Sequence, residues 1–283
     1  MKTERIRPTD YEQRERPKTR AKQFFDIFKH RFLELIKLSL LQAVFSLPML
    51  AIIFIFWMIL PNALKSSSPQ QAALGVFLVT GGAMLIALPI AFVGLTGSFY
   101  ALKKLAYAEG EFASSAFFIG MKEEWKRGLL IGFIAGLSAA ISIIGIFFFL
   151  VFPTQINVWV KGFGIAIVVI QLIIVLIVCY YSIAQVVVYS NTLRRLLKNS
   201  VIMTLIRFPI NLGLLILYPG GFIALICIMP ITMYVGLGLM ILTAVFGHLV
   251  WMMNTMSAFD KYINKEQFPD YYRKGLYQET EEE

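Results

Sequence analysis

Residues 128–152 read GLLIGFIAGLSAAISIIGIFFFLVF, an apolar stretch without a charged side chain. The stretch is longer than the roughly 18 apolar residues that mark a membrane-spanning helix. Comparable stretches occur at about 32–60, 72–102, 158–189, 209–228 and 230–253. The sequence therefore predicts an all-α integral membrane protein with six transmembrane helices.

The composition agrees with this class of protein. The chain has 283 residues, of which 58% are hydrophobic and 15% are charged, whereas soluble domains carry about a quarter charged residues. We expect a basic tail with an interfacial helix at 1–31, a transmembrane domain at 32–253 and a C-terminal tail at 254–283. In the interfacial helix, phenylalanines recur at helical spacing from Phe24 to Phe32, which is typical of a helix lying on a membrane surface.

The distribution of basic residues predicts the orientation. With six spans, all of the 26 Lys and Arg residues except Lys65 and Lys161 fall on one side of the membrane. Positive charge favours the cytoplasmic side. Both termini are therefore expected in the cytoplasm of a bacterial cell, with the basic tail attracted to anionic lipid headgroups. Nothing else in the sequence favours nucleic acid as a partner.

Two segments between the spans have amphipathic patterns, at 109–126 and 191–207, and each predicts a short helix at the cytoplasmic surface. The alternatives for both are a docking surface for a partner and an elbow that only rests on the membrane. The candidate docking residues are aromatic and basic: Phe117, Phe118, Lys122, Trp125, Lys126, Arg194 and Arg195.

Small residues recur every four positions in the third span, at Gly128, Gly132, Gly136 and Ala140. Such a face lets another helix approach closely. The sequence leaves open whether that helix belongs to the same chain or to a partner subunit.

Few polar residues lie within the spans, and the candidates among them are Gln171, Gln185, Asn211 and His248. Such side chains form hydrogen bonds between helices or bind a neutral solute. A single histidine with no carboxylate at the same depth is a poor proton relay and a poor metal site. No sequence motif for catalysis is present, so we expect no enzymatic activity, no catalytic residues, no cofactor and no metal.

Several motifs resemble those of the YesL-like family of bacterial polytopic membrane proteins. They are LPIAFVG at 88–94, SFYALKKL at 98–105, FFIGMKEEWK at 117–126 and LIRFP at 205–209. The resemblance covers roughly residues 85–215. It implies a bacterial membrane protein without assigned catalysis, of a kind associated with carbohydrate uptake through ABC-type importers.

Two functions follow as expectations. The leading one is a non-catalytic auxiliary subunit of a bacterial membrane transporter, such as an ABC-type carbohydrate importer. It would contact the transporter subunits through helix faces and cytoplasmic elbows. The alternative is a membrane protein of the permease or vitamin-capture type that itself binds or translocates a neutral solute.

Overall fold

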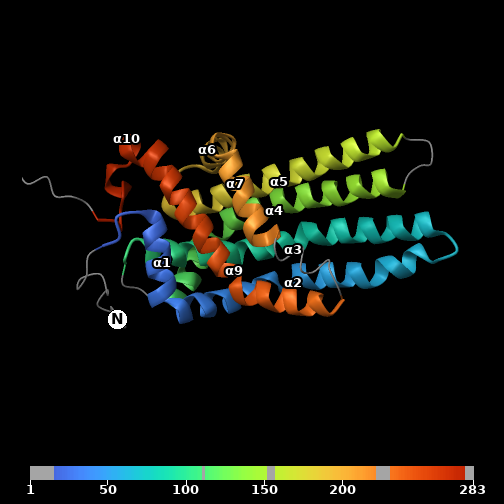
Figure 1. The fold of residues 1–283 in the computed structure, drawn as a ribbon, viewed down its shortest axis with the longest axis horizontal. Coiled ribbons are helices and arrows are strands. Elements are labelled where there is room, and N and C mark those ends of the chain that lie inside the picture. Colours follow the sequence, from blue (N-terminus) through green and yellow to red (C-terminus); the bar gives the residue numbers. More distant parts are fainter. Residues whose placement is uncertain (1–15, 110–111, 152–156, 221–229, 278–283) are drawn as a thin grey trace, which may run out of the picture.

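The computed structural model describes residues 16–109, 112–151, 157–220 and 230–277, and all regular secondary structure within them is helical (Figure 1). Five helices are long and apolar enough to cross a membrane, and a bent helix pair makes a sixth span possible. The prediction of an all-α membrane protein is confirmed. The long helices are α2 (Phe32–Leu64), α3 (Pro69–Ala106), α4 (Ala113–Val151), α5 (Val158–Val188) and α9 (Pro230–Phe259).

The bent pair consists of α6 (Leu193–Ile206) and α7 (Phe208–Leu215), which meet at 88°. Pro209 lies in the first turn of α7, where its missing N–H is tolerated, but it could not continue α6 in a straight line. The chain continues into a π-helical turn at Ile216–Gly220. The end of the predicted fifth span, at 221–228, lies outside the described residues.

The predicted surface helix at 109–126 is not a separate element. Helix α4 begins at Ala113 and runs without a break into the third span. No proline interrupts this segment, and good helix formers such as Met121, Lys122 and Glu123 lead directly into the apolar stretch. The amphipathic pattern therefore belongs to the end of a long transmembrane helix.

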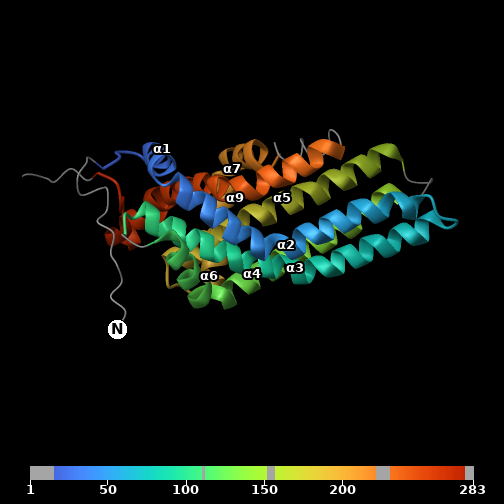
Figure 2. The same cartoon turned by 90° about the horizontal axis from the view of Figure 1, so that it is seen from below.

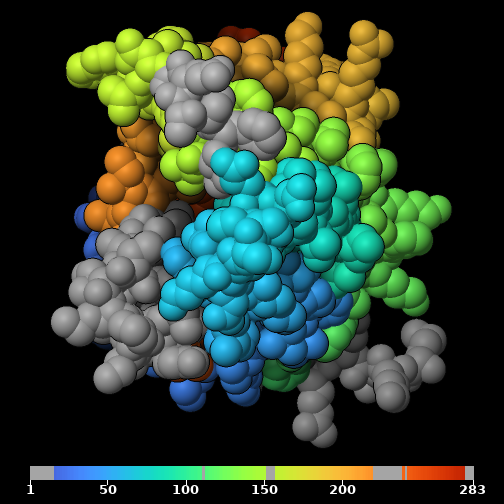
Figure 3. All heavy atoms as spheres, turned by 90° about the vertical axis from the view of Figure 1, so that its right-hand side faces the viewer, coloured from blue at the N-terminus to red at the C-terminus, as the bar shows by residue number. Residues whose placement is uncertain are grey.

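The bundle has two ends of different character. The hairpins α2–α3 and α4–α5 extend furthest towards one end, which faces the viewer in Figure 3, and both described chain ends lie at the other (Figures 1 and 2). There the backbone N–H of Tyr277 donates to the carbonyl of Pro17 over 3.2 Å. This hydrogen bond joins the described N-terminal segment to the described C-terminal segment.

Helix α1 (Arg20–His30) runs across the long axis of the bundle in Figure 1. Its N-cap is Thr19, whose hydroxyl accepts a hydrogen bond from the backbone of Lys22. The rings of Phe28 and Phe32 pack on Phe246 of α9, each with centroids 5.4 Å apart. Phe25 remains exposed, as expected for a helix on a membrane surface.

The segment after α9 folds back onto α1. It contains a π-helical turn (Asp260–Asn264), the short helix α10 (Lys265–Gln267) and a 3-10 turn (Pro269–Tyr271). Arg20 forms a buried ion pair with Asp260 over 2.8 Å. Tertiary folding therefore buries Asp260, a carboxylate that belongs to the predicted C-terminal tail at 254–283.

A close backbone approach completes this end of the bundle. Gly275 adopts φ +82°, and a Cβ there would collide with the carbonyl oxygen of Ala106. The amide of Gln23 donates to that same carbonyl over 2.6 Å and to the carbonyl of Gly275 over 3.2 Å. One buried side chain thus links α1, the end of α3 and the C-terminal segment.

Candidate functional site

The small-residue face of α4 packs against α3 of the same chain. A Cβ at Gly132 would lie 2.6 Å from the Cα of Pro89, and one at Gly136 would lie 3.0 Å from the carbonyl oxygen of Met84. A Cβ at Gly128 would lie 2.5 Å from the hydroxyl oxygen of Thr96. At the far end of the face, Ala140 lies against Gly81 of α3. This face is therefore occupied within the chain.

Three of the four polar candidates form hydrogen bonds between helices. Gln171 of α5 donates to Ser138 of α4 over 2.7 Å. Gln185 of α5 donates to Ser200 of α6 over 2.7 Å. Asn211 of α7 accepts from the hydroxyl of Tyr181 over 3.0 Å. These contacts show that all three amides join neighbouring helices, although Oε1 of Gln185 has no hydrogen-bond partner among the described residues.

The fourth polar candidate, His248, lies buried beside aromatic rings. It is only 7% exposed, and its ring lies against Phe99 and Tyr180, with centroids 5.8 and 5.9 Å away. Its Nδ1 has no hydrogen-bond partner among the described residues. One turn further along α9, the same holds for the indole Nε1 of Trp251. A buried polar atom without a partner costs about 1–3 kcal/mol, so two of them on one helix face are notable.

Two cavities meet at His248. The first, between α2, α3, α5 and α9, measures about 190 Å³ and we call it the α2–α9 cavity. The second, beside α7 and α9, measures about 150 Å³ and we call it the α7–α9 cavity. Tyr180 and His248 line both of them, and Trp251 lines the second. Because the two side chains are shared, a ligand in either cavity could reach them.

The polar groups of the α2–α9 cavity come from α2 as well. Gln42 donates to the carbonyl of Ala91 over 3.2 Å and accepts from Ser98 over 2.9 Å. The hydroxyl of Ser46 donates to the carbonyl of Gln42 over 3.1 Å. These bonds fix the orientation of the amide at the cavity wall. A ligand would meet neutral polar groups held in place before it binds.

Apart from Tyr218 in the α7–α9 cavity, the other residues that line the two cavities are apolar. In neither of them does an Asp, Glu, Lys or Arg of the described chain contribute to the wall. Within the same described ranges, no three His, Cys, Asp or Glu side chains converge on one point. Sequence reasoning singled out His248 but missed Tyr180, since a tyrosine in an apolar run gives no signal of which neighbour it faces.

The candidate docking residues differ in exposure. Phe117 is fully buried, and a Cβ at Gly97 of α3 would lie 2.7 Å from its carbonyl oxygen. Phe118 and Trp125 are 49% and 45% exposed. The basic candidates are exposed on α4 and α6: Lys122, Lys126, Arg194 and Arg195. Phe117 therefore belongs to the core of the bundle and the others to its surface.

Comparison with protein-family models, with curated proteins and with solved structures gave no match. Fold and site together define a multi-pass helical membrane protein with an uncharged, partly polar cavity between its helices.

Proposed function

We propose that this protein binds a neutral, hydrogen-bonding solute between its helices, next to His248. The observation that carries the proposal is the pair of buried polar atoms without partners, Nδ1 of His248 and Nε1 of Trp251. Both residues line the α7–α9 cavity. A solute with a hydroxyl or carbonyl group would satisfy these atoms and recover the free energy that their burial costs.

The walls of the cavities indicate the chemistry of this solute. The rings of Tyr180 and Trp251 lie with centroids 5.1 Å apart and provide aromatic faces. Apolar walls with a few fixed polar groups are typical of small-molecule sites. An ion would enter without a counter-charge, which is unfavourable in a low-dielectric site. A sugar or an uncharged vitamin-like ring suits these groups.

Neighbouring tyrosines on α5 provide the test. The hydroxyl of Tyr181 is bound to Asn211, whereas Tyr180 lines both cavities. Purified protein in nanodiscs is titrated with a panel of neutral sugars and vitamins, and binding is measured by thermal stabilisation. Tyr180→Phe should weaken binding about 2- to 10-fold, the effect of one hydrogen bond.

Tyr181→Phe is the matched control, because it removes the same atom from the adjacent residue. It should lower the free energy of unfolding by about 1 kcal/mol and leave solute affinity unchanged. If no solute in the panel stabilises the protein, or if both variants weaken binding equally, the proposal is wrong for those solutes.

A second candidate function is that of an auxiliary subunit of a bacterial transporter, as the resemblance to the YesL-like family implies. The observation that favours it is the exposed aromatic and basic group on the first turns of α4, which includes Phe118, Lys122 and Trp125. On this proposal the end of the bundle that carries the chain ends faces the cytoplasm, in agreement with its positive charge.

Purification in mild detergent followed by mass spectrometry tests this second function. A transporter subunit should copurify at stoichiometric level with the wild type and be lost from a Phe118→Ala, Trp125→Ala variant. Trp159→Ala is the matched control, because Trp159 is 82% exposed at the start of α5, towards the opposite end. Recovery of the chain alone would contradict this function.

A further inference from the structure

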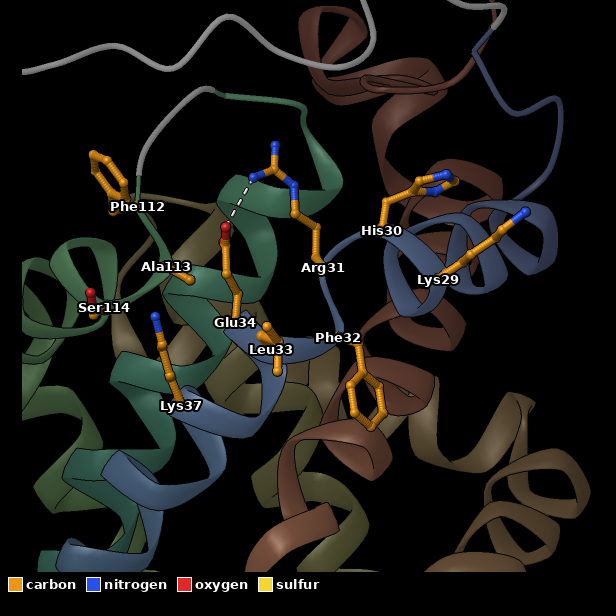
Figure 4. Close-up of a pocket in the computed structure, with 10 residues that line it drawn as sticks. All are labelled: Lys29, His30, Arg31, Phe32, Leu33, Glu34, Lys37, Phe112, Ala113 and Ser114. Carbon is orange, nitrogen blue, oxygen red and sulfur yellow. Dashed lines mark hydrogen bonds and ion pairs between the residues drawn. The ribbon is translucent and has the colours of Figure 1, made fainter.

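A polar pocket of about 460 Å³ lies where α1 passes into α2, beside the start of α4 (Figure 4). Arg31 and Glu34, both in its wall, form an ion pair over 3.0 Å, so their charges largely cancel. Lys29 and Lys37 are exposed, and neither has an ion-pair partner within the described chain. Among the described residues that line the pocket, positive charges therefore outnumber negative ones.

The positions of these lysines show which of them could hold a ligand. Lys37 rises from α2 towards the first turn of α4, where Ser114 lies (Figure 4). Lys29 stands on the opposite side and points away from Lys37. Lys37 and the hydroxyl of Ser114 thus form the part of the pocket suited to an anionic oxygen, and Lys29 adds positive potential.

The same pocket has an apolar margin. Phe32 and Leu33, which line it, are 43% and 70% exposed. They follow directly on α1, whose exposed Phe25 marks it as a membrane-surface helix. A ligand bound at Lys37 would therefore lie at the level of the lipid headgroups.

Deeper in the bundle an open groove of about 440 Å³ runs over α3, with α4 on one side and Phe45 of α2 on the other. Its walls are apolar and aromatic and are formed by Phe45, Leu85, Ile86, Pro89, Ile90, Val93, Trp125, Leu129 and Phe133. Phe45 lies eight residues after Lys37 on α2, about 12 Å along the helix axis. Its ring packs on Phe117, one turn after Ser114 on α4, with centroids 5.9 Å apart. The pocket and the groove therefore lie one after the other along the line where α2 and α4 come together over α3, which we call the seam.

We propose that this seam binds a phospholipid with an anionic headgroup. The phosphate lies between Lys37 and Ser114, and an acyl chain occupies the groove beside Phe45 and Trp125. The positive pocket complements the phosphate, and the groove below it suits a hydrocarbon chain rather than a soluble phosphate. The site is separate from the cavities at His248 and does not depend on the proposed solute, but it shares Trp125 with the candidate docking surface on α4.

Trp125 allows the site to be observed directly. Wild-type protein and Trp125→Phe are reconstituted in phosphatidylcholine vesicles that contain brominated phosphatidylglycerol or brominated phosphatidylcholine. Trp125 lines the groove, so quenching that is present in the wild type and absent from Trp125→Phe reports brominated lipid in the groove. In the wild type we expect stronger quenching by the anionic lipid than by phosphatidylcholine. Lys37→Gln should reduce this preference about fivefold, because one lysine at a membrane surface contributes roughly 1 kcal/mol.

Two variants control for charge. Lys37→Arg should retain the preference, and so should Lys65→Gln, which removes one positive charge beyond the other end of α2. Native mass spectrometry of wild type and Lys37→Gln gives a second measurement, in which retained phosphatidylglycerol should fall. Equal quenching by both lipids, or an unchanged preference in Lys37→Gln, would overturn the proposal. Displacement of the brominated lipid by soluble glycerol phosphate would show that the pocket binds free phosphate instead.

Discussion

Glu109 lies between two lysines at the end of the bundle that carries the chain ends. Its carboxylate contacts Lys104 over 2.7 Å and Lys274 over 2.9 Å. Partial burial acts to raise the pKa of Glu109, but the hydrogen bonds and positive charges of the two lysines outweigh burial and hold the pKa below its ordinary value. The carboxylate therefore joins the end of α3 to the C-terminal segment in its charged form.

This contact predicts a dependence of stability on pH. Because the folded-state pKa is depressed, the unfolded state binds the proton more tightly. The contribution of Glu109 is fully present above its unfolded pKa of about 4.3 and is lost as the pH falls through the lower folded pKa. The melting temperature of the wild type should fall between pH 7 and pH 3 as this contribution is lost. The melting temperature of Glu109→Gln should fall less over the same range. Glu123→Gln, at an exposed position on α4, should keep the wild-type profile, and an identical profile for Glu109→Gln would contradict the prediction.

At the scale of elements, the α3–α4 pair depends on close backbone approach. A methyl group at Gly132 would meet the Cα of Pro89 at 2.6 Å and the Cβ of Phe92 at 2.7 Å. Backbone atoms cannot move aside as a flexible side chain would. Gly132→Ala should therefore lower the free energy of unfolding by about 1–3 kcal/mol, as overpacking does, when unfolding is measured by denaturant titration in detergent.

Gly82→Ala is the matched control on the partner helix. A Cβ at Gly82 would meet nothing within 4 Å. The substitution should be neutral or stabilise the helix by up to about 1 kcal/mol, because alanine is the better helix former. Equal destabilisation by both substitutions would mean that helix propensity, and not close packing, controls this pair.

For the whole molecule, the ion pair between Arg20 and Asp260 joins residues from near the two ends of the chain. Arg20 is 8% exposed and Asp260 is 9% exposed. Asp260→Asn would leave a buried guanidinium without its counter-charge, which typically costs about 3–5 kcal/mol. We expect the free energy of unfolding, measured by denaturant titration, to fall by that amount. Amide hydrogen exchange in α1 should become faster.

Glu124→Gln provides the comparison, because Glu124 pairs with Arg127 near the protein surface over 3.1 Å. Surface pairs of this kind contribute about 0–1 kcal/mol. If Asp260→Asn costs no more than Glu124→Gln, then the two described ends of the chain are not held together by this pair.

The orientation of the whole molecule can be tested by cysteine labelling in a variant without the native cysteines. Ser67→Cys lies in the connection between α2 and α3, and Arg16→Cys lies before α1. A membrane-impermeant maleimide should label position 67 in intact cells and position 16 only after permeabilisation. Labelling of position 16 in intact cells would overturn the cytoplasmic placement of the N-terminal end.

Much of the fold could be predicted from the sequence, because hydropathy is a local property. The apolar run at 128–152 requires a helix in a membrane whatever its neighbours are, since backbone polar groups in lipid must be satisfied within the segment. The amphipathic pattern at 109–126 does not by itself determine one structure. It fits both a separate surface helix and the end of a longer one, and only the unbroken α4 distinguishes them.

The candidate site could be predicted only in part. The sequence by itself determined that the chain is a bundle of apolar helices, that its charges gather outside them and that His248 is a rare polar group at depth. Only the tertiary structure decided that Gln171 and Asn211 are used in packing and that Asp260 is buried. It also decided that His248 shares both cavities with Tyr180 and one of them with Gln42. The reason is physical. Hydrophobicity acts on each segment separately, whereas hydrogen bonds and cavities depend on which residues distant in the sequence the packed helices bring face to face.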